Sequence, residues 1–177
     1  MIMSAKTWHL PARVDEIPET GRRFALEADS ATRDALTRTT GTPGISRLHA
    51  TFDVTPHGGG VRVVGTVSAS VRQTCVVTLE PLDNEIEETV DLIFMPSREG
   101  PGDAAARSEA AAGAIQPPEP LVGGVIDLGA VAAEFLVLGI DPYPRKAGAV
   151  FAAPSAGDAS AHPFAALAAL NKSKGDR

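Results

Sequence analysis

This sequence contains little that would support secretion, membrane insertion or a disulfide framework. Its 177 residues include one cysteine, so no intrachain disulfide can form, and a lone thiol is typical of a reducing compartment. No apolar run approaches the roughly 20 residues that a bilayer span needs. The first ten residues lack the basic, apolar and small-residue order of a signal peptide. We therefore expect a cytoplasmic protein that does not enter a membrane.

Aromatic residues are also scarce, at 5% of the chain, although hydrophobic residues reach 44%. The core must then consist mainly of Val, Leu, Ile and Ala, with Phe24, Phe52, Phe94 and Phe135 as its larger members. A chain of this length can bury one substantial core. We expect a single domain over residues 1–150, followed by a flexible tail over 151–177.

A surplus of basic residues is missing as well, because the formal net charge is −6. Residues 81–134 carry eleven acidic and two basic side chains, whereas the rest of the chain is close to neutral. Proteins that bind RNA through its phosphates normally present a basic face. An acidic stretch suits a basic partner, such as a ribosomal protein, or simply increases solubility.

What the sequence does contain is alternating apolar residues joined by short turns. Residues 22–28, 45–55, 61–75 and 85–95 have the period of two that is typical of strands, with Gly65 expected at a bulge or bend. Turns are expected at 57–60, where three glycines follow His57, and at 81–84. This order predicts an α+β fold with a twisted antiparallel sheet of about five to seven strands, which can curl into a partial barrel.

Two main helices and two flexible segments complete the predicted domain. Asp29 or Ser30 can cap a helix that continues to about Thr39, and Asp127 can cap one over 128–139. The second helix should pack on the sheet through the apolar residues Leu128, Val131, Ala132, Phe135 and Leu138. The Ala, Gly and Pro-rich stretch at about 97–122 is predicted to be a mobile loop. Residues 152–161 are predicted to be flexible and to precede a short amphipathic C-terminal helix at 163–170.

Residues that could support catalysis or metal binding do not form a recognisable pattern. Zinc needs about four sulfur or imidazole ligands, and the chain offers Cys75 and four scattered histidines. Cys75 lacks a neighbouring base, and no serine-hydrolase or phosphate-loop motif occurs. We therefore expect no enzyme, no metal and no cofactor, and we interpret Cys75 as a small residue packed near a strand end.

Contact with RNA or a protein is the remaining possibility. Arg47, Arg62 and Arg72 fall on outward positions of neighbouring strands, and Gln73 joins them only if the strand end is irregular. They are the best candidates for RNA contact, although no aromatic stacking platform accompanies them. At the C-terminus, Phe164 and Leu167 have helical spacing and can dock on the chain's own domain or in a partner's groove.

One segment resembles a known family. Cys75 and the sequence Leu79–Glu80–Pro81 match a Cys-x-x-Cys-Leu-Glu-Pro motif, except that Thr78 replaces the second cysteine. Further matches are Ile126–Asp127–Leu128–Gly129 and the sequence His-Pro-Phe-Ala-Ala-Leu over 162–167. In this order they resemble the YceD family, and the resemblance runs from about Arg23 to Tyr143.

This resemblance implies a function that the residues alone do not. It implies a non-enzymatic accessory factor that supports 23S ribosomal RNA accumulation and assembly of the large ribosomal subunit. The implied partners are a basic ribosomal protein or a 23S precursor, and no small-molecule substrate or membrane is expected. Cys75, Glu80 and Pro81 are then candidates for partner contact. Two alternatives stay open, namely direct RNA binding through the exposed sheet face and an enzyme centred on Cys75.

Overall fold

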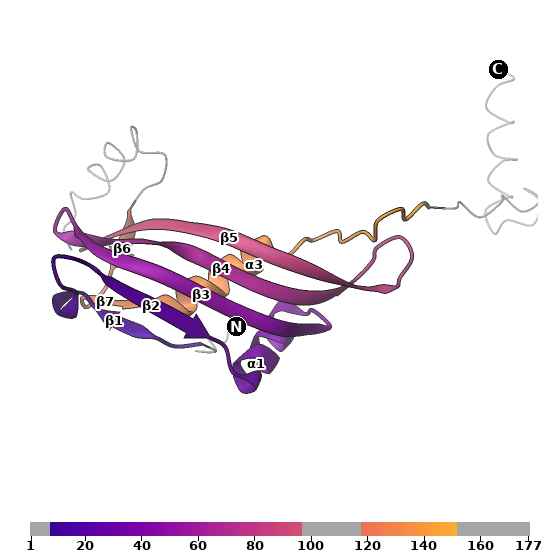
Figure 1. The fold of residues 1–177 in the computed structure, drawn as a ribbon, viewed down its shortest axis with the longest axis horizontal. Coiled ribbons are helices and arrows are strands. Elements are labelled where there is room, and N and C mark those ends of the chain that lie inside the picture. The colour runs from indigo at the N-terminus through magenta and orange to yellow at the C-terminus, as the bar shows by residue number, and fades with distance from the viewer. Residues whose placement is uncertain (1–7, 97–117, 152–177) are drawn as a thin grey trace, which may run out of the picture.

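The computed structural model describes residues 8–96 and 118–151 (Figure 1). Five strands form the main sheet in the order β2-β3-β4-β5-β6, and two short strands, β1 and β7, pair separately. The elements in chain order are β1 (Pro11–Arg13), the 3-10 turn η1 (Val14–Glu16), β2 (Arg22–Glu27), α1 (Ser30–Thr40), β3 (Gly44–His57), β4 (Gly60–Thr74), β5 (Pro81–Pro96), β6 (Glu119–Leu121), β7 (Val125–Asp127) and α3 (Leu128–Gly139).

The main sheet is mostly antiparallel and open. Neighbouring strands from β2 to β5 pair antiparallel, whereas β6 pairs parallel with the end of β5. Because the strand order is linear, the sheet does not close into a barrel. The predicted α+β class and twisted, largely antiparallel sheet are confirmed. None of the described helices is long and apolar enough to cross a membrane.

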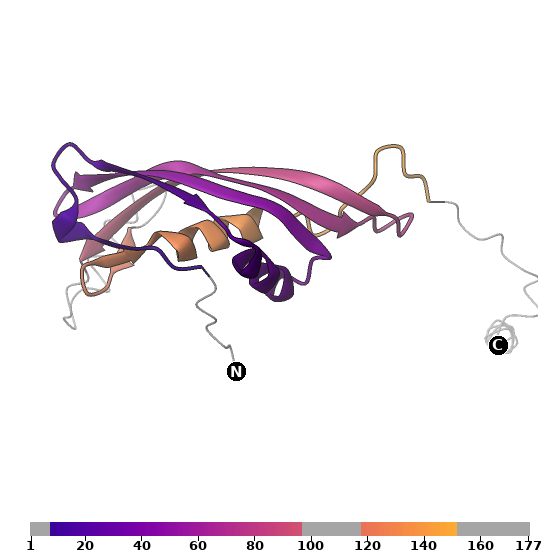
Figure 2. The same ribbon diagram turned by 60° about the horizontal axis from the view of Figure 1, so that its bottom comes forward.

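The domain has two layers. Both helices and the β1–β7 pair lie on one face of the sheet, and the described residues leave the opposite face uncovered (Figure 2). Alternation along the strands explains this arrangement, because Leu48, Ala50, Phe52 and Val54 of β3 are buried while the residues between them are largely exposed. Of the four phenylalanines expected in the core, Phe52 is fully buried, and the other three are partly buried and pack against the core.

Local signals set both helices. Asp29 accepts a hydrogen bond from the Thr32 amide at 2.7 Å, and α1 ends at Gly41, whose φ of 68° is the left-handed conformation that glycine tolerates. Asp127 accepts hydrogen bonds from the amides of Gly129 and Ala130 at 3.1 and 3.3 Å, so α3 begins directly after β7. Both predicted caps are confirmed.

Gly65 occupies a position where the core leaves no room for a side chain. A Cβ there would overlap the Thr51 carbonyl oxygen and lie 2.7 Å from Cδ1 of Phe52. The glycine thus lets the Phe52 ring pack against β4. Of the bulge or bend expected at this residue, the bulge is wrong, because the register between β3 and β4 is regular here and shifts at Ile45/Arg47 instead.

Three further predictions need correction. The turn expected at 81–84 lies earlier, at about Cys75–Glu80, and β5 already begins at Pro81 because its first residues pair with the end of β4. Leu138 was expected to face the sheet but is 68% exposed, and Leu136 is buried in its place. The segment predicted as a loop at 97–122 lies mostly outside the described residues, and its last part contains β6.

Candidate interaction surface

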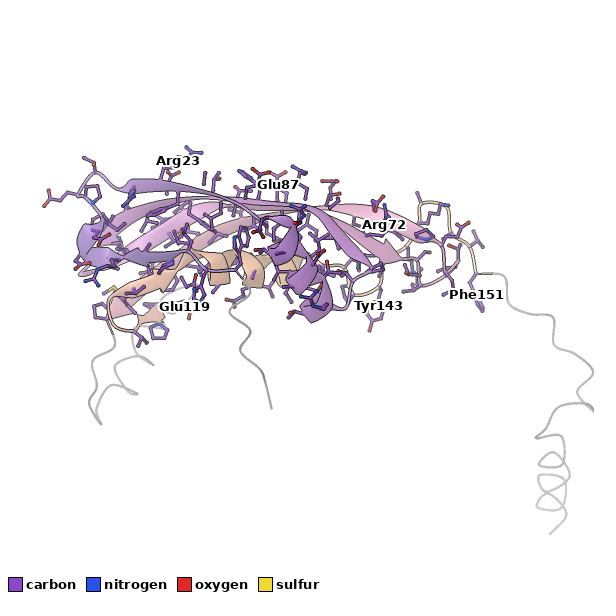
Figure 3. The ribbon with its side chains drawn as sticks, turned by 90° about the horizontal axis from the view of Figure 1, so that it is seen from below. Arg23, Arg72, Glu87, Glu119, Tyr143 and Phe151 are labelled. Carbon is purple, nitrogen blue, oxygen red and sulfur yellow. The ribbon has the colours of Figure 1, made fainter. Side chains whose placement is uncertain are left out.

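The uncovered face of the sheet carries the three arginines proposed as contact residues. Arg72 on β4 and Arg23 on β2 both point away from the helices, as does Glu87 on β5 (Figure 3). Arg47 and Arg62 are exposed on the outward positions of β3 and β4. The prediction that they share one face is therefore correct.

Arg47, Arg62 and Arg72 are each already paired with a carboxylate of β5, whereas Arg23 lies 3.9 Å from Asp53 of β3. Arg47 contacts Glu85 at 2.7 Å, and Arg72 contacts Asp83 at 2.9 Å. Arg62 contacts both carboxylate oxygens of Asp91 at 2.8 and 2.6 Å. The register of β3, β4 and β5 brings the partners of each pair close together. The pairs lower the pKa of Asp83 and Asp91, and hydrogen bonds from Ser70 and Arg47 lower the pKa of Glu85. The arginines do not form a free basic patch.

The same face is weakly acidic once these pairs are counted. Glu27 and Glu87 are exposed there, and neither has an ion pair within the described residues. A phosphate backbone would have to displace carboxylates from the arginines and approach further carboxylates. The face therefore suits a cationic surface better than an RNA backbone.

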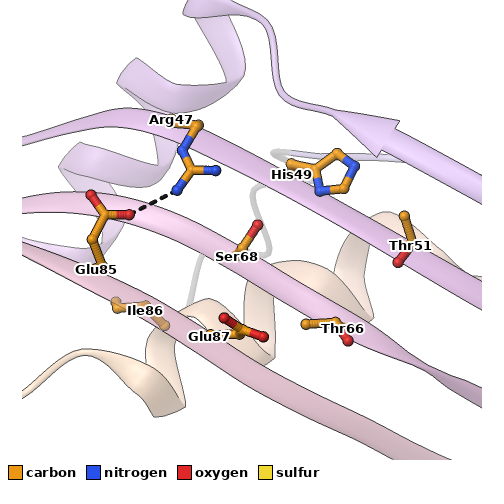
Figure 4. A pocket seen from close by; sticks show the side chains of 8 residues that line it. All are labelled: Arg47, His49, Thr51, Thr66, Ser68, Glu85, Ile86 and Glu87. Carbon is orange, nitrogen blue, oxygen red and sulfur yellow. Dashed lines mark hydrogen bonds and ion pairs between the residues drawn. The ribbon is translucent and has the colours of Figure 1, made fainter.

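A shallow trough of about 270 Å³ lies on this face between β3, β4 and β5 (Figure 4). Its floor consists of the small side chains Thr51, Thr66 and Ser68, and the Arg47–Glu85 pair closes one end. Small hydroxyl side chains leave the sheet backbone close to the surface, so a partner could approach it closely. The trough is wide open to solvent and does not enclose a small molecule.

Ser68 stands between His49 of β3 and Glu87 of β5 on one rung of the sheet. These are the residue types of a serine hydrolase, but their order differs from that of a catalytic relay. Catalysis needs the histidine between the acid and the serine, with hydrogen bonds along the row. Within the described residues no hydrogen bond joins any two of the three side chains, and the row is exposed to water.

Gln73 does not lie on the uncovered face of the sheet, which is called the outer face below. Its side chain is 6% exposed and faces the helix layer, where it donates a hydrogen bond to the Asp141 carbonyl at 2.7 Å and accepts one from Asn84 Nδ2 at 2.6 Å. The proposed contact role of Gln73 through that face is wrong, because the strand is regular at this point. The residue instead joins β4, β5 and the segment after α3.

Cys75 lies in the turn between β4 and β5 and is completely buried. Its Sγ accepts hydrogen bonds from the backbone amides of Thr78 and Lys146, both at 3.4 Å. These donors, the Lys146 amide foremost and then Thr78, lower the pKa of the thiol to about 6. The two amides thus favour the thiolate form of the sulfur.

The turn that holds Cys75 is closed by further contacts. The amide of Cys75 donates to the Glu80 carbonyl at 2.9 Å, the amide of Val76 donates to the Pro144 carbonyl at 2.9 Å, and Lys146 Nζ lies 2.8 Å from Glu80. The described residues include no group of three or more metal-ligating side chains. Thr78 and Lys146 offer their amides to the sulfur, so Cys75 helps to hold this turn against the segment after α3.

The proposed site residues therefore divide into separate groups. Arg47, Arg62 and Arg72 lie on the outer face, whereas Cys75 and Glu80 belong to the closed turn and Pro81 begins β5 opposite Thr74. Phe164 and Leu167 lie outside the described residues. Sequence reasoning missed the pairing of each arginine with Asp83, Glu85 or Asp91, although the alternation of residues 85–95 already placed Glu85 and Asp91 outward. Nothing in the sequence signalled the role of Lys146.

Comparison with known proteins gives one match. The model of a family described as the large ribosomal RNA subunit accumulation protein YceD matches residues 63–171, which is more than half of the chain. The match begins in β4 and includes the Cys75 turn, β5, β6, β7 and α3. No curated protein and no solved structure matches the chain.

Proposed function

This chain belongs to the YceD family, and from that membership we propose that it supports the accumulation of 23S ribosomal RNA as a non-enzymatic accessory factor in large-subunit assembly. The observation that carries the proposal is the family match over residues 63–171. The family's description connects it with accumulation of the large-subunit RNA. We place the protein in the cytoplasm, where subunits are assembled.

The charge of the outer face favours a protein partner over direct RNA contact. Arg47, Arg62 and Arg72 are each neutralised by a carboxylate, and Glu87 adds an uncompensated charge within the described part of the face. Ribosomal proteins are basic, so a weakly acidic surface would attract them during assembly and repel the RNA around them. In this proposal the protein escorts or positions a basic large-subunit protein.

Depletion of the protein in growing cells tests the proposal. We expect the ratio of 23S to 16S ribosomal RNA to fall and large-subunit precursors to accumulate in sucrose gradients. A tagged copy should restore the ratio and recover large-subunit proteins after crosslinking. The proposal would be overturned if the ratio stays unchanged on depletion and the tagged protein recovers no large-subunit component.

A further inference from the structure

A groove of about 400 Å³ runs between β5 and α3, on the helix side of the sheet and away from the paired arginines. One wall is the end of β5, with Leu92 and Phe94, and the other is a single stripe of α3, with Val131, Phe135 and Leu138. Residues of β6 and β7 close one end. Gly139, the last residue of α3, lies close to Ile86 and Glu88 of β5, where a Cβ would overlap the Ile86 side chain.

The strand that forms one wall is also an open edge. β5 pairs with β4 along most of its length, but on its other side β6 covers only Phe94–Pro96. Within the described residues, the backbone from Pro81 to Ile93 has no strand beside it on that side. Such an edge presents unpaired N–H and C=O groups that can accept another strand. β6 demonstrates that a strand can pair with this side of β5 at the adjacent residues Phe94–Pro96.

The α3 side of the groove exposes apolar side chains to solvent, where polar side chains are usual. Leu138 is 68% exposed, and Val125, at the closed end, is 36% exposed. Leu92, Phe94 and Phe135 are only partly buried by the domain itself. An added strand would cover this surface, because every second side chain of a strand points to the same face.

The rim of the groove is acidic. Glu119, Asp127 and Glu134 line it, and no lysine or arginine of residues 8–96 and 118–151 does. Asp127 caps α3 and contacts His9, whereas Glu119 and Glu134 have no ion pair within the described residues. A partner that fits must therefore combine apolar residues with positive charge.

We propose that this groove binds an extended segment of a basic large-subunit ribosomal protein, which adds as a strand to the edge of β5. Alternate side chains of that segment pack against Leu92, Phe135 and Leu138, and its basic residues lie near Glu119 and Glu134. The edge supplies backbone hydrogen bonds, and the groove and its rim select the side chains. This inference rests on the proposed function and adds a contact surface on the helix side of the sheet, separate from the outer face.

Two other occupants fit less well. Phe151, the last residue that the structure describes, lies at the opposite end of the domain from Glu119, as Figure 3 shows, so an occupant reaching the groove from Phe151 would have to span the length of the domain. A second copy docked by two-fold symmetry would place one acidic rim against another, in a chain whose net charge is −6. A basic partner avoids both difficulties.

Crosslinking in growing cells tests the occupant directly. A benzophenone amino acid is incorporated in place of Leu138 in the full chain, and the crosslinked peptides are identified by mass spectrometry. The control carries the same amino acid in place of Val137, which is 50% exposed on the same helix but does not line the groove. We expect the position of Leu138 alone to capture a basic segment of a large-subunit protein. Capture of this chain's own residues, of a second copy or of RNA would overturn the inference.

Substitutions test whether the groove carries the affinity. We expect Leu138→Glu to lower binding to the captured segment, made as a synthetic peptide, by about tenfold to a hundredfold, the effect of losing one buried apolar contact. Glu134→Lys should also lower binding, through repulsion of the basic segment. Val137→Glu and the charge reversal Asp34→Lys on α1 serve as matched controls that keep the affinity. Methylation of alternate backbone amides of the peptide should abolish binding, since it removes strand pairing. Equal binding by all variants would overturn the groove as the site.

The experiments distinguish a failure of the groove from a failure of the proposed function. If depletion lowers the 23S ratio and the protein recovers large-subunit components, but the position of Leu138 captures none of them, the groove is wrong and the function stands. If depletion changes nothing and no component is recovered, the function itself fails.

Discussion

The side chains of Gln73 and Asn84 are joined by a 2.6 Å hydrogen bond across β4 and β5, at the end of the sheet where the segment after α3 passes. The other end of the Gln73 amide donates to the Asp141 carbonyl at 2.7 Å. A single buried polar side chain thus connects two strands and the exit of α3. This end of the sheet depends on that one amide, because a buried polar group must find partners to offset its loss of water.

Gln73→Ala should therefore destabilise the fold. We expect a loss of about 1–3 kcal/mol in the free energy of unfolding, because the Asp141 carbonyl and the Asn84 amide lose their partner. Urea denaturation followed by circular dichroism measures this loss, with Thr66→Ala on the outer face as the control. In a double-mutant cycle, Gln73→Ala and Asn84→Ala should be non-additive. Additive effects would mean that the two side chains do not act together.

Cys75 should make stability depend on pH between about 6 and 8.5. The pKa of the thiol is lowered to about 6 in the folded chain, whereas an unfolded thiol has a pKa of about 8.5. The stabilisation is fully present above the unfolded pKa and is lost as the pH falls through the folded one. Stability relative to Cys75→Ser should thus rise from about pH 5 through 7 to 9.

The ultraviolet absorbance of the thiolate gives an independent measurement of this pKa. In the native protein the absorbance should titrate with a midpoint near 6, whereas in urea the midpoint should move to that of an ordinary thiol. A native midpoint equal to the unfolded one would show that the amides of Thr78 and Lys146 do not hold a thiolate.

Gly65→Ala should weaken the domain through the core. The new methyl group would overlap the Thr51 carbonyl oxygen and press on the Phe52 ring, so either the strands or the ring must move. Overpacking of this kind costs about 1–3 kcal/mol. Gly44→Ala is the matched control in β3, because its Cβ would meet only Arg72 Cβ at 3.9 Å. Thermal unfolding compares them, and equal melting temperatures would contradict the predicted collision.

Removal of the carboxylates that pair with Arg47, Arg62 and Arg72 should raise the affinity of the outer face for RNA. In the triple variant Asp83→Asn, Glu85→Gln and Asp91→Asn, three arginines lose their carboxylates. Affinity for a single-stranded RNA oligomer should rise, and the slope of log K against log salt should steepen by about 2 for three added phosphate contacts. Fluorescence anisotropy at several salt concentrations measures both.

A control with the same change in net charge separates pairing from charge alone. Glu27→Gln, Glu87→Gln and Asp34→Asn remove three carboxylates that hold no arginine in the described part of the chain. We expect this variant to gain much less affinity for RNA. If both variants gain equally, the ion pairs do not mask the arginines.

Much of the fold was predictable because its signals are local. Alternation along residues 45–55 placed Phe52 inward and Arg47 outward, and the short carboxylates Asp29 and Asp127 marked the helix starts. Predictions failed where local signals compete. Proline at 81 suggested a turn, but it begins β5 because the first residue of a strand tolerates proline. Leu138 has the helical spacing of a core residue, yet it is 68% exposed because the sheet does not extend far enough to cover it.

The amino-acid sequence by itself determined the strands of the hairpins, both helix starts, the acidic character of β5 and the family motif around Cys75, since each depends on neighbours along the chain. Only the tertiary structure decided what these residues contact. Arg62 meets Asp91, 29 residues away, and Cys75 receives the Lys146 amide from 71 residues away. Such contacts follow from strand register and from the path of the chain after α3, and these are properties of the packed molecule.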